Sequence, residues 1–168
     1  MIICIIYFII SFILENVMAG IFPATLGDVS YFTTIYTVIA LVVVYPYFAN
    51  EKKYYILVLI FGTLFGVLYT SSLIVNIVLF LLITFVIKLL NDFMPDNIFI
   101  VNIISIICII IYHTLSFVIL NLVTSQTYSL FLLGNIIIHS IFMTLIYTSI
   151  SYFILKIIYN KFDMKHIK

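Results

Sequence analysis

Three ionisable side chains lie inside long apolar stretches, where a charged group is costly and therefore marks a candidate site. They are Glu15, His113 and His139. Counted from the outer ends of the apolar segments that contain them, they lie about 10, about 15 and about 12 Å deep at a rise of 1.5 Å per helical residue. Because these depths are similar, the three residues can meet in one intramembrane polar layer, where a carboxylate would stabilise a neighbouring imidazolium.

This polar layer has two interpretations. In the first it forms a small pocket or a proton-responsive pair, extended by asparagines such as Asn76 and Asn135. In the second, which is the more common arrangement, each histidine hydrogen-bonds a neighbouring helix and Glu15 is protonated or paired for packing. A metal site is disfavoured because no two ligands lie three or four residues apart within one segment. We predict neither a metal nor a cofactor.

A second motif is the Gly62-Thr63-Leu64-Phe65-Gly66 sequence. Two glycines at this spacing leave one helix face bare, so that another helix backbone can approach closely. The approaching helix can belong to this chain or to a second protein. Hydroxyls in the turn that follows can satisfy freed backbone groups, and an asparagine lies one turn into the next segment. The predicted packing or partner-contact residues are Gly62, Gly66, Tyr69, Thr70 and Asn76.

The elements that position these residues follow from composition. The chain has 168 residues, of which 66% are hydrophobic and 8% charged, whereas soluble domains carry about 25% charged residues. A transmembrane barrel needs strands that alternate apolar and polar residues, but residues 98–111 are almost uniformly apolar. We therefore predict a single all-α membrane domain over 1–168, a bundle of about six transmembrane helices. The predicted spans are 2–22, 31–49, 55–70, 73–90, 98–123 and 131–158.

The seven basic residues are all lysines, and their positions predict the orientation of this bundle. An even number of spans places both termini on one side, and all seven lysines then fall on that side too. They are Lys52, Lys53, Lys88, Lys156, Lys161, Lys165 and Lys168. Because cytoplasmic loops are enriched in positive residues, both termini are predicted to be cytoplasmic. No basic stripe suggests nucleic acid as a partner.

The sequence contains none of the common reaction motifs. It has no GxSxG, HExxH, CxxC or phosphate-binding loop, and no arginine for a two-point contact with a phosphate or carboxylate. Cys4 and Cys108 lie in apolar runs and are predicted to be small buried hydrophobic residues. We predict that the protein is not an enzyme.

The stretch from Phe61 to Asn76 resembles the signature of the MreD family of rod shape-determining membrane proteins. In that family a helix with a GxxxG-like spacing precedes a turn of small residues, a leucine and the next span. Similarity in length and span number, with Phe22-Pro23 after the first span and Glu15 within it, extends the resemblance over the chain. The chain departs from the family at Tyr69 and Thr70, where an aspartate is frequent, and at Ile74, where a glycine is common.

The resemblance implies a non-catalytic component of the bacterial cell-elongation machinery in the plasma membrane. Its implied partners are an MreC-like bitopic protein, a RodA-type glycosyltransferase with its penicillin-binding protein and, through the complex, the MreB cytoskeleton. The alternative is a substrate-binding membrane subunit of an energy-coupling factor vitamin transporter, which has a similar size and helix number. For that function the polar layer of Glu15, His113 and His139 is the candidate pocket. A membrane enzyme of lipid metabolism is a third alternative, which the missing motifs disfavour.

Overall fold

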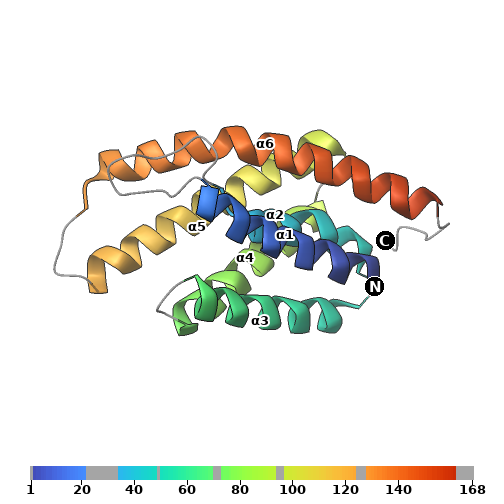
Figure 1. Cartoon of the computed structure of the whole chain (residues 1–168), viewed down its shortest axis with the longest axis horizontal. Helices are drawn as coiled ribbons and strands as arrows, with labels where there is room; N and C mark the ends of the chain where they lie inside the picture. Colours follow the sequence, from blue (N-terminus) through green and yellow to red (C-terminus); the bar gives the residue numbers. More distant parts are fainter. Residues whose placement is uncertain are drawn as a thin grey trace.

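The computed structural model describes residues 2–21, 34–48, 50–69, 73–93, 97–123 and 128–161. These residues form an all-helical bundle (Figure 1). Its elements are α1 (Ile2–Ile21), α2 (Tyr36–Val44), the 3-10 helix η1 (Tyr45–Tyr47), α3 (Glu51–Leu68), α4 (Leu73–Phe93), α5 (Ile98–Val123) and α6 (Leu130–Lys161).

Four of the described helices are long and apolar enough to cross a membrane: α1, α4, α5 and α6. Their 20, 21, 26 and 32 residues all reach the roughly 30 Å of a hydrocarbon core at 1.5 Å per residue. The helices predicted over 2–22, 73–90, 98–123 and 131–158 are therefore confirmed as helices of sufficient length.

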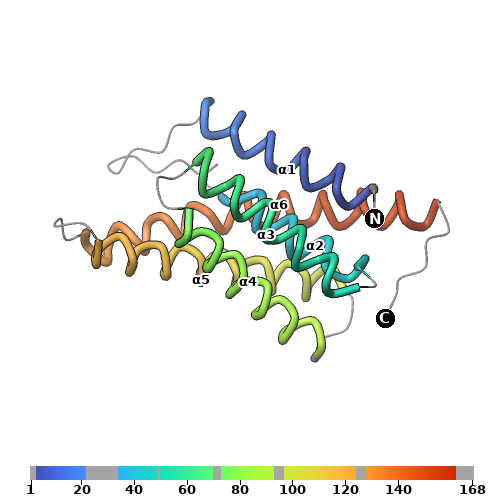
Figure 2. The backbone as a smooth tube through the Cα atoms, turned by 90° about the horizontal axis from the view of Figure 1, so that it is seen from below, coloured from blue at the N-terminus to red at the C-terminus, as the bar shows by residue number. Residues whose placement is uncertain are grey.

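The helix found within the predicted span 31–49 is much shorter than that span. α2 has nine residues and continues into η1 around Pro46, which together advance only about 20 Å. All nine residues of α2 are buried, and α2 packs against α1, α4, α5 and α6. It is the central helix of the bundle, lying between the others in both views (Figures 1 and 2). A helix that is apolar on every side suits a protein core as well as lipid.

The third predicted span, 55–70, begins earlier than expected. The predicted span leaves residues 51–54 outside the helix, but Glu51, Lys52 and Lys53 form the first turn of α3. The reason is a helix cap, because the Asn50 side chain accepts a hydrogen bond of 2.9 Å from the backbone N–H of Lys52. With three charged residues in its first turn, α3 is not among the four helices that are long and apolar enough to cross a membrane. Six crossings therefore remain a prediction.

The helices pack as two hairpins around α2. α3 packs on α4 and α5 on α6, while α1 packs mainly on α2. The first turn of α3, the last turns of α4 and the end of α6 lie at the same end of the bundle as the start of α1 (Figures 1 and 2). An ion pair of 2.7 Å between Lys88 and Glu51 joins α4 to α3 there, and Cys4 lies 2.7 Å from the Tyr159 hydroxyl.

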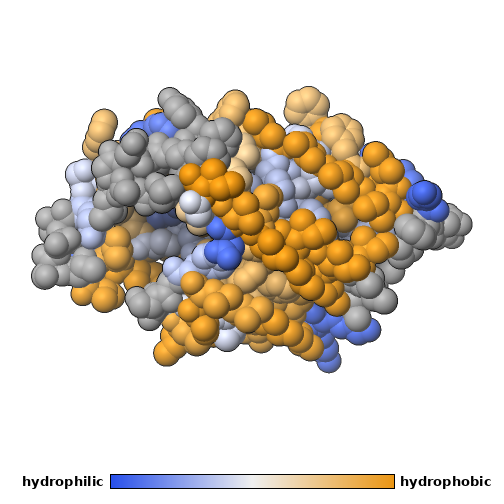
Figure 3. All heavy atoms as spheres, viewed as in Figure 1, coloured by the Kyte–Doolittle hydropathy of each residue, from blue (hydrophilic) through white to orange (hydrophobic). Residues whose placement is uncertain are grey.

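This lysine end contains all the lysines in the described residues: Lys52, Lys53, Lys88, Lys156 and Lys161. Between it and the opposite end, hydrophobic residues cover much of the face drawn in Figure 3. Isoleucines of α1, α3 and α6, for example Ile10, Ile60 and Ile157, are more than half exposed. A surface of this kind is typical of helices that face lipid.

Candidate functional site

Glu15 is buried between α1 and α2, with 8% of its surface exposed. One carboxylate oxygen accepts a hydrogen bond of 3.0 Å from the backbone N–H of Thr37 and another of 2.9 Å from the Thr37 hydroxyl. The backbone of Tyr36 also contributes to holding the carboxylate. Glu15 therefore meets the N-terminus of α2 rather than the charged group of another side chain.

This contact supplies a hydrogen-bond acceptor to the start of α2, which is buried inside the bundle. The first N–H groups of a helix have no partner within the helix, and the helix dipole places partial positive charge there. Ile35, which precedes α2, makes no side-chain cap. The Glu15 carboxylate supplies an acceptor and negative charge in its place. Close by, the Thr34 hydroxyl lies 2.8 Å from the Thr144 hydroxyl of α6, which ties the entry to α2 to a third helix.

Three tyrosines interact electrostatically with this carboxylate. The phenols of Tyr36, Tyr69 and Tyr112 lie close enough to Glu15 to interact with its charge. The Tyr112 hydroxyl donates a hydrogen bond of 3.0 Å to the side-chain oxygen of Asn76, which links α5 to α4. We call these residues, contributed by five helices or their ends, the Glu15 cluster: Glu15, Tyr36, Thr37, Tyr69, Asn76 and Tyr112.

Tyr69 closes the cluster on the side of α3. Its hydroxyl donates a hydrogen bond of 2.9 Å to the backbone carbonyl of Phe12 in α1. Its ring packs edge-on against the Phe12 ring, with 5.2 Å between centroids, and lies tilted against the Phe65 ring at 4.9 Å. Tyr69 therefore joins the end of α3 to α1. Thr70, the neighbouring residue of the predicted contact set, lies outside the described residues.

The two histidines predicted to share a layer with Glu15 are not bonded to it. Within the described residues, the hydrogen bonds of Glu15 go to the start of α2. His139 Nδ1 lies 2.8 Å from the backbone carbonyl of Asn135, one turn earlier in α6. Nε2 of His113 is buried without a hydrogen-bond partner among the described residues. The structure thus gives Glu15 and His139 separate hydrogen-bond partners on different helices.

The two glycines of the GxxxG motif lie against α4 of the same chain. A Cβ atom built on Gly66 would lie 2.8 Å from the Cα of Leu73, and one built on Gly62 would lie 3.3 Å from the Cβ of Phe80. Both glycines are buried. The motif therefore allows α3 and α4 to approach closely, and a second protein could reach this glycine face only by displacing α4.

The sequence interpretation missed Thr37, Tyr36 and Tyr112, which complete the cluster. Thr37 lies in an apolar run, and a threonine there usually bonds the carbonyl of its own helix. The signal that could have identified Thr37 is its position in the first turn of a helix. That signal is usable only when the start of α2 at Tyr36 is known. Among the described residues, no group of three or more potential ligands is arranged to hold a metal ion.

The fold and the buried cluster define an all-helical protein with four helices able to cross a membrane and polar contacts concentrated in its interior. Comparison of the chain with protein-family models, with curated proteins and with solved structures found no match.

Proposed function

We propose that this protein is a non-catalytic scaffold of the bacterial cell-elongation machinery, similar to the MreD family and embedded in the plasma membrane. The observation that supports the proposal best is the packing of residues 61–76, which carry the resemblance. In this stretch α3 and α4 approach so closely that Gly66 leaves no room for a methyl group beside Leu73. The signature thus has a physical role in this chain, as the contact that forms a tight helical hairpin.

The proposed orientation places the lysine end in the cytoplasm. Its five lysines are contributed by α3, α4 and α6, so the same end collects positive charge from separate parts of the sequence. Positive residues favour the cytoplasmic side. In this orientation the start of α1 and the end of α6 are cytoplasmic, as expected for a protein with six crossings.

A scaffold of this kind acts through helix faces that remain free in the monomer. The glycine face is covered by α4, so we assign partner contact to the exposed face of α6. In the apolar stretch of α6 only 11% is buried, against 22–33% in those of the other three candidate spans, α1, α4 and α5. Exposed side chains line one face of α6 at helical spacing: Phe142, Ile146, Ile150, Phe153 and Ile157. The proposed partners are an MreC-like bitopic protein and, in the same complex, a RodA-type glycosyltransferase, its penicillin-binding protein and MreB.

The decisive experiment is affinity purification of the tagged full-length protein from its native bacterium in mild detergent, followed by mass spectrometry. Recovery of MreC-like and glycosyltransferase partners is expected. Recovery of an ATPase pair with a coupling membrane subunit would contradict the scaffold function and favour the vitamin-transporter alternative. Ile150→Trp on α6 should reduce the yield of the partners, whereas Ile10→Trp, at a similarly exposed position on α1, serves as the matched control.

One observation favours the transporter alternative. α2 begins inside the bundle, and the termini of such short, interrupted helices build substrate sites in several transporter families. In this chain, however, the N-terminus of α2 is occupied by Glu15. A transported vitamin would have to replace or recruit that carboxylate, so binding of a vitamin by the purified protein should be lost in Glu15→Ala if this alternative is correct.

A further inference from the structure

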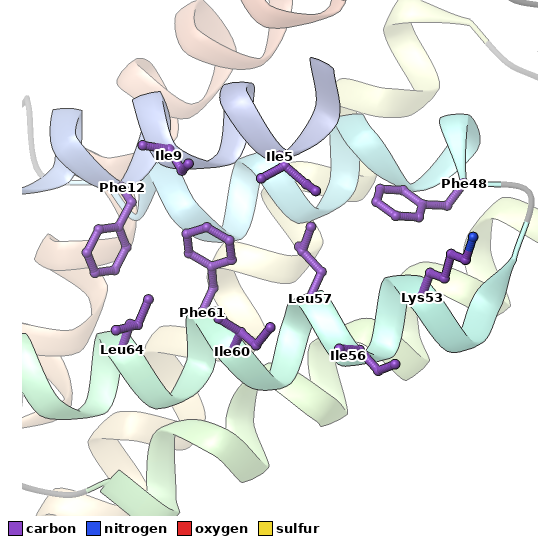
Figure 4. Close-up of a pocket in the computed structure, with 10 residues that line it drawn as sticks. All are labelled: Ile5, Ile9, Phe12, Phe48, Lys53, Ile56, Leu57, Ile60, Phe61 and Leu64. Atoms are coloured by element: carbon purple, nitrogen blue, oxygen red, sulfur yellow. The ribbon is translucent and has the colours of Figure 1, made fainter. Parts of the chain in front are cut away.

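An apolar groove runs between α1 and α3 on the outside of the bundle (Figure 4). α1 packs on α2 rather than closely on α3, which leaves a space of about 600 Å³ between them. Its lining is apolar except for one lysine: Ile5, Ile9, Phe12, Phe48, Lys53, Ile56, Leu57, Ile60, Phe61 and Leu64. None of the residues of the Glu15 cluster or the two predicted histidines lines it.

The two ends of the groove differ. Phe12 and Leu64 lie at one end, where the hydrogen bond from Tyr69 to the Phe12 carbonyl joins α3 to α1. Phe48 and Lys53 lie at the other end, which is the lysine end of the bundle (Figure 4). The groove is thus an apolar channel along the bundle with a positive charge at one mouth.

The width of the groove indicates whether a helix or a lipid acyl chain can occupy it. From Lys53 to Leu64, α3 advances about 16.5 Å. A volume of about 600 Å³ over that length corresponds to a mean cross-section of about 36 Å². A helix with side chains, about 10 Å across, needs about 80 Å². An extended hydrocarbon chain needs only about 20 Å², because non-bonded carbon atoms approach to about 4 Å. The groove therefore accommodates an acyl chain but not the body of a helix.

The charge at the mouth favours an anionic headgroup. Glu51, the nearest acidic neighbour along α3, is engaged by Lys88 in an ion pair of 2.7 Å. The ammonium group of Lys53, by contrast, has no hydrogen-bond or ion-pair partner in the part of the chain that the structure describes. Lys52 beside it adds a second positive charge. Lysines near a membrane surface attract anionic lipids.

We propose that this groove is a binding site for an anionic phospholipid. One acyl chain lies along Ile9, Ile60 and Phe61, and the headgroup phosphate binds Lys53 at the lysine end. The site is separate from the partner face on α6 and from the glycine face. The proposal does not depend on the scaffold function.

The absence of tryptophan from this chain permits a sharp test. An Ile60→Trp variant of the full-length protein carries a single reporter in the groove, which can be excited selectively beside the thirteen tyrosines. The protein is reconstituted in vesicles that contain brominated phosphatidylglycerol or brominated phosphatidylcholine with identical acyl chains. The ratio of the two quenching efficiencies measures the preference of the groove for the anionic headgroup. Ile154→Trp, on the outer face of α6, reports on the surrounding lipid as the matched control.

The expected result is a preference for phosphatidylglycerol of about five-fold at Ile60→Trp and a ratio near one at Ile154→Trp. Adding Lys53→Gln should reduce the ratio at Ile60→Trp to near one. Adding Lys161→Gln, which removes a lysine from the same end but away from the groove, should leave it unchanged. Circular dichroism and monodisperse elution verify that each variant is folded.

A ratio near one in the groove, or a ratio that Lys53→Gln leaves unchanged, would overturn the proposal. The same holds if neither lipid quenches the reporter, since a helix of a partner or a second copy would then shield the groove. Because the larger side chain at position 60 can itself narrow the groove, Ile56→Trp provides a second reporter nearer to Lys53. Both reporters must show the preference for the proposal to stand.

Discussion

Substitution of Gly66 by alanine gives the most direct test of the α3–α4 packing. The added methyl group would lie 2.8 Å from the Cα of Leu73 and 3.2 Å from its carbonyl oxygen. Carbon atoms in contact lie at about 3.5–4.0 Å, so the two helices must separate by about 1 Å. Because the atoms in the way belong to the backbone, no side chain can rotate aside to relieve the contact.

The magnitude follows from two opposing effects. Overpacking a core by one methyl group costs about 1–3 kcal/mol, and a backbone contact favours the upper half of that range. Replacing glycine by alanine in a helix returns up to about 1 kcal/mol, less near the helix end, where Gly66 lies. We therefore expect Gly66→Ala to lower the free energy of unfolding by about 1–2 kcal/mol.

The chain supplies matched controls for this substitution. A Cβ atom added to Gly134 in α6 would meet no atom within 4 Å, so Gly134→Ala should raise the free energy of unfolding by about 0.5–1 kcal/mol. Gly62→Ala places its methyl group 3.3 Å from the Cβ of Phe80, and its effect should be close to zero. The free energies are measured by titration with sodium dodecyl sulfate in mixed micelles, followed by circular dichroism. If Gly66→Ala is as stable as Gly134→Ala, the proposed close approach of α3 and α4 is wrong.

Two further predictions concern the Glu15 cluster. Glu15→Ala removes the acceptor for the N–H and hydroxyl of Thr37, so it should lower the free energy of unfolding by about 1–3 kcal/mol, whereas Glu15→Gln keeps an acceptor and should lose less; equal losses in the same titration would argue against capping of α2. Tyr112→Phe removes only the donor to Asn76 and should cost about 1 kcal/mol. A loss below the error of the titration would show that this hydrogen bond contributes nothing to stability.

The helix over 98–123 was predicted with its observed bounds because the sequence there is a long, largely apolar run between polar segments. Asn97 accepts the first backbone bonds of α5, from Ile100 and Val101, with N···O distances of 3.0 Å. An apolar run of this length forms a helix in a membrane protein, so the local sequence is enough to predict this element. The start of α3 was missed because the predicted span began after the charged residues, whereas the Asn50 cap makes those residues helical.

The shortness of α2 could not be predicted from its composition. Residues such as Val42 and Val43 are equally compatible with lipid and with a protein interior, and only the surrounding helices decide between the two. The contact of Gly62 and Gly66 with α4 shows a related limit. A GxxxG motif predicts that some helix approaches, but it does not say whether that helix belongs to the same chain.

The placement of Glu15 shows why depth was insufficient to predict the candidate site. A rise of 1.5 Å per residue fixes how deep a side chain lies, but each residue also turns the helix by about 100°, so equal depth does not bring side chains together. The unpaired backbone N–H groups of α2 determine the partner of Glu15, and the histidines do not. A helix that begins inside an apolar bundle exposes N–H groups that no water can satisfy, and each such group is costly. α2 can begin at Tyr36 because Glu15 on α1 accepts hydrogen bonds from Thr37. The acidic residue of the first apolar segment is therefore accounted for by the capping of a buried helix start.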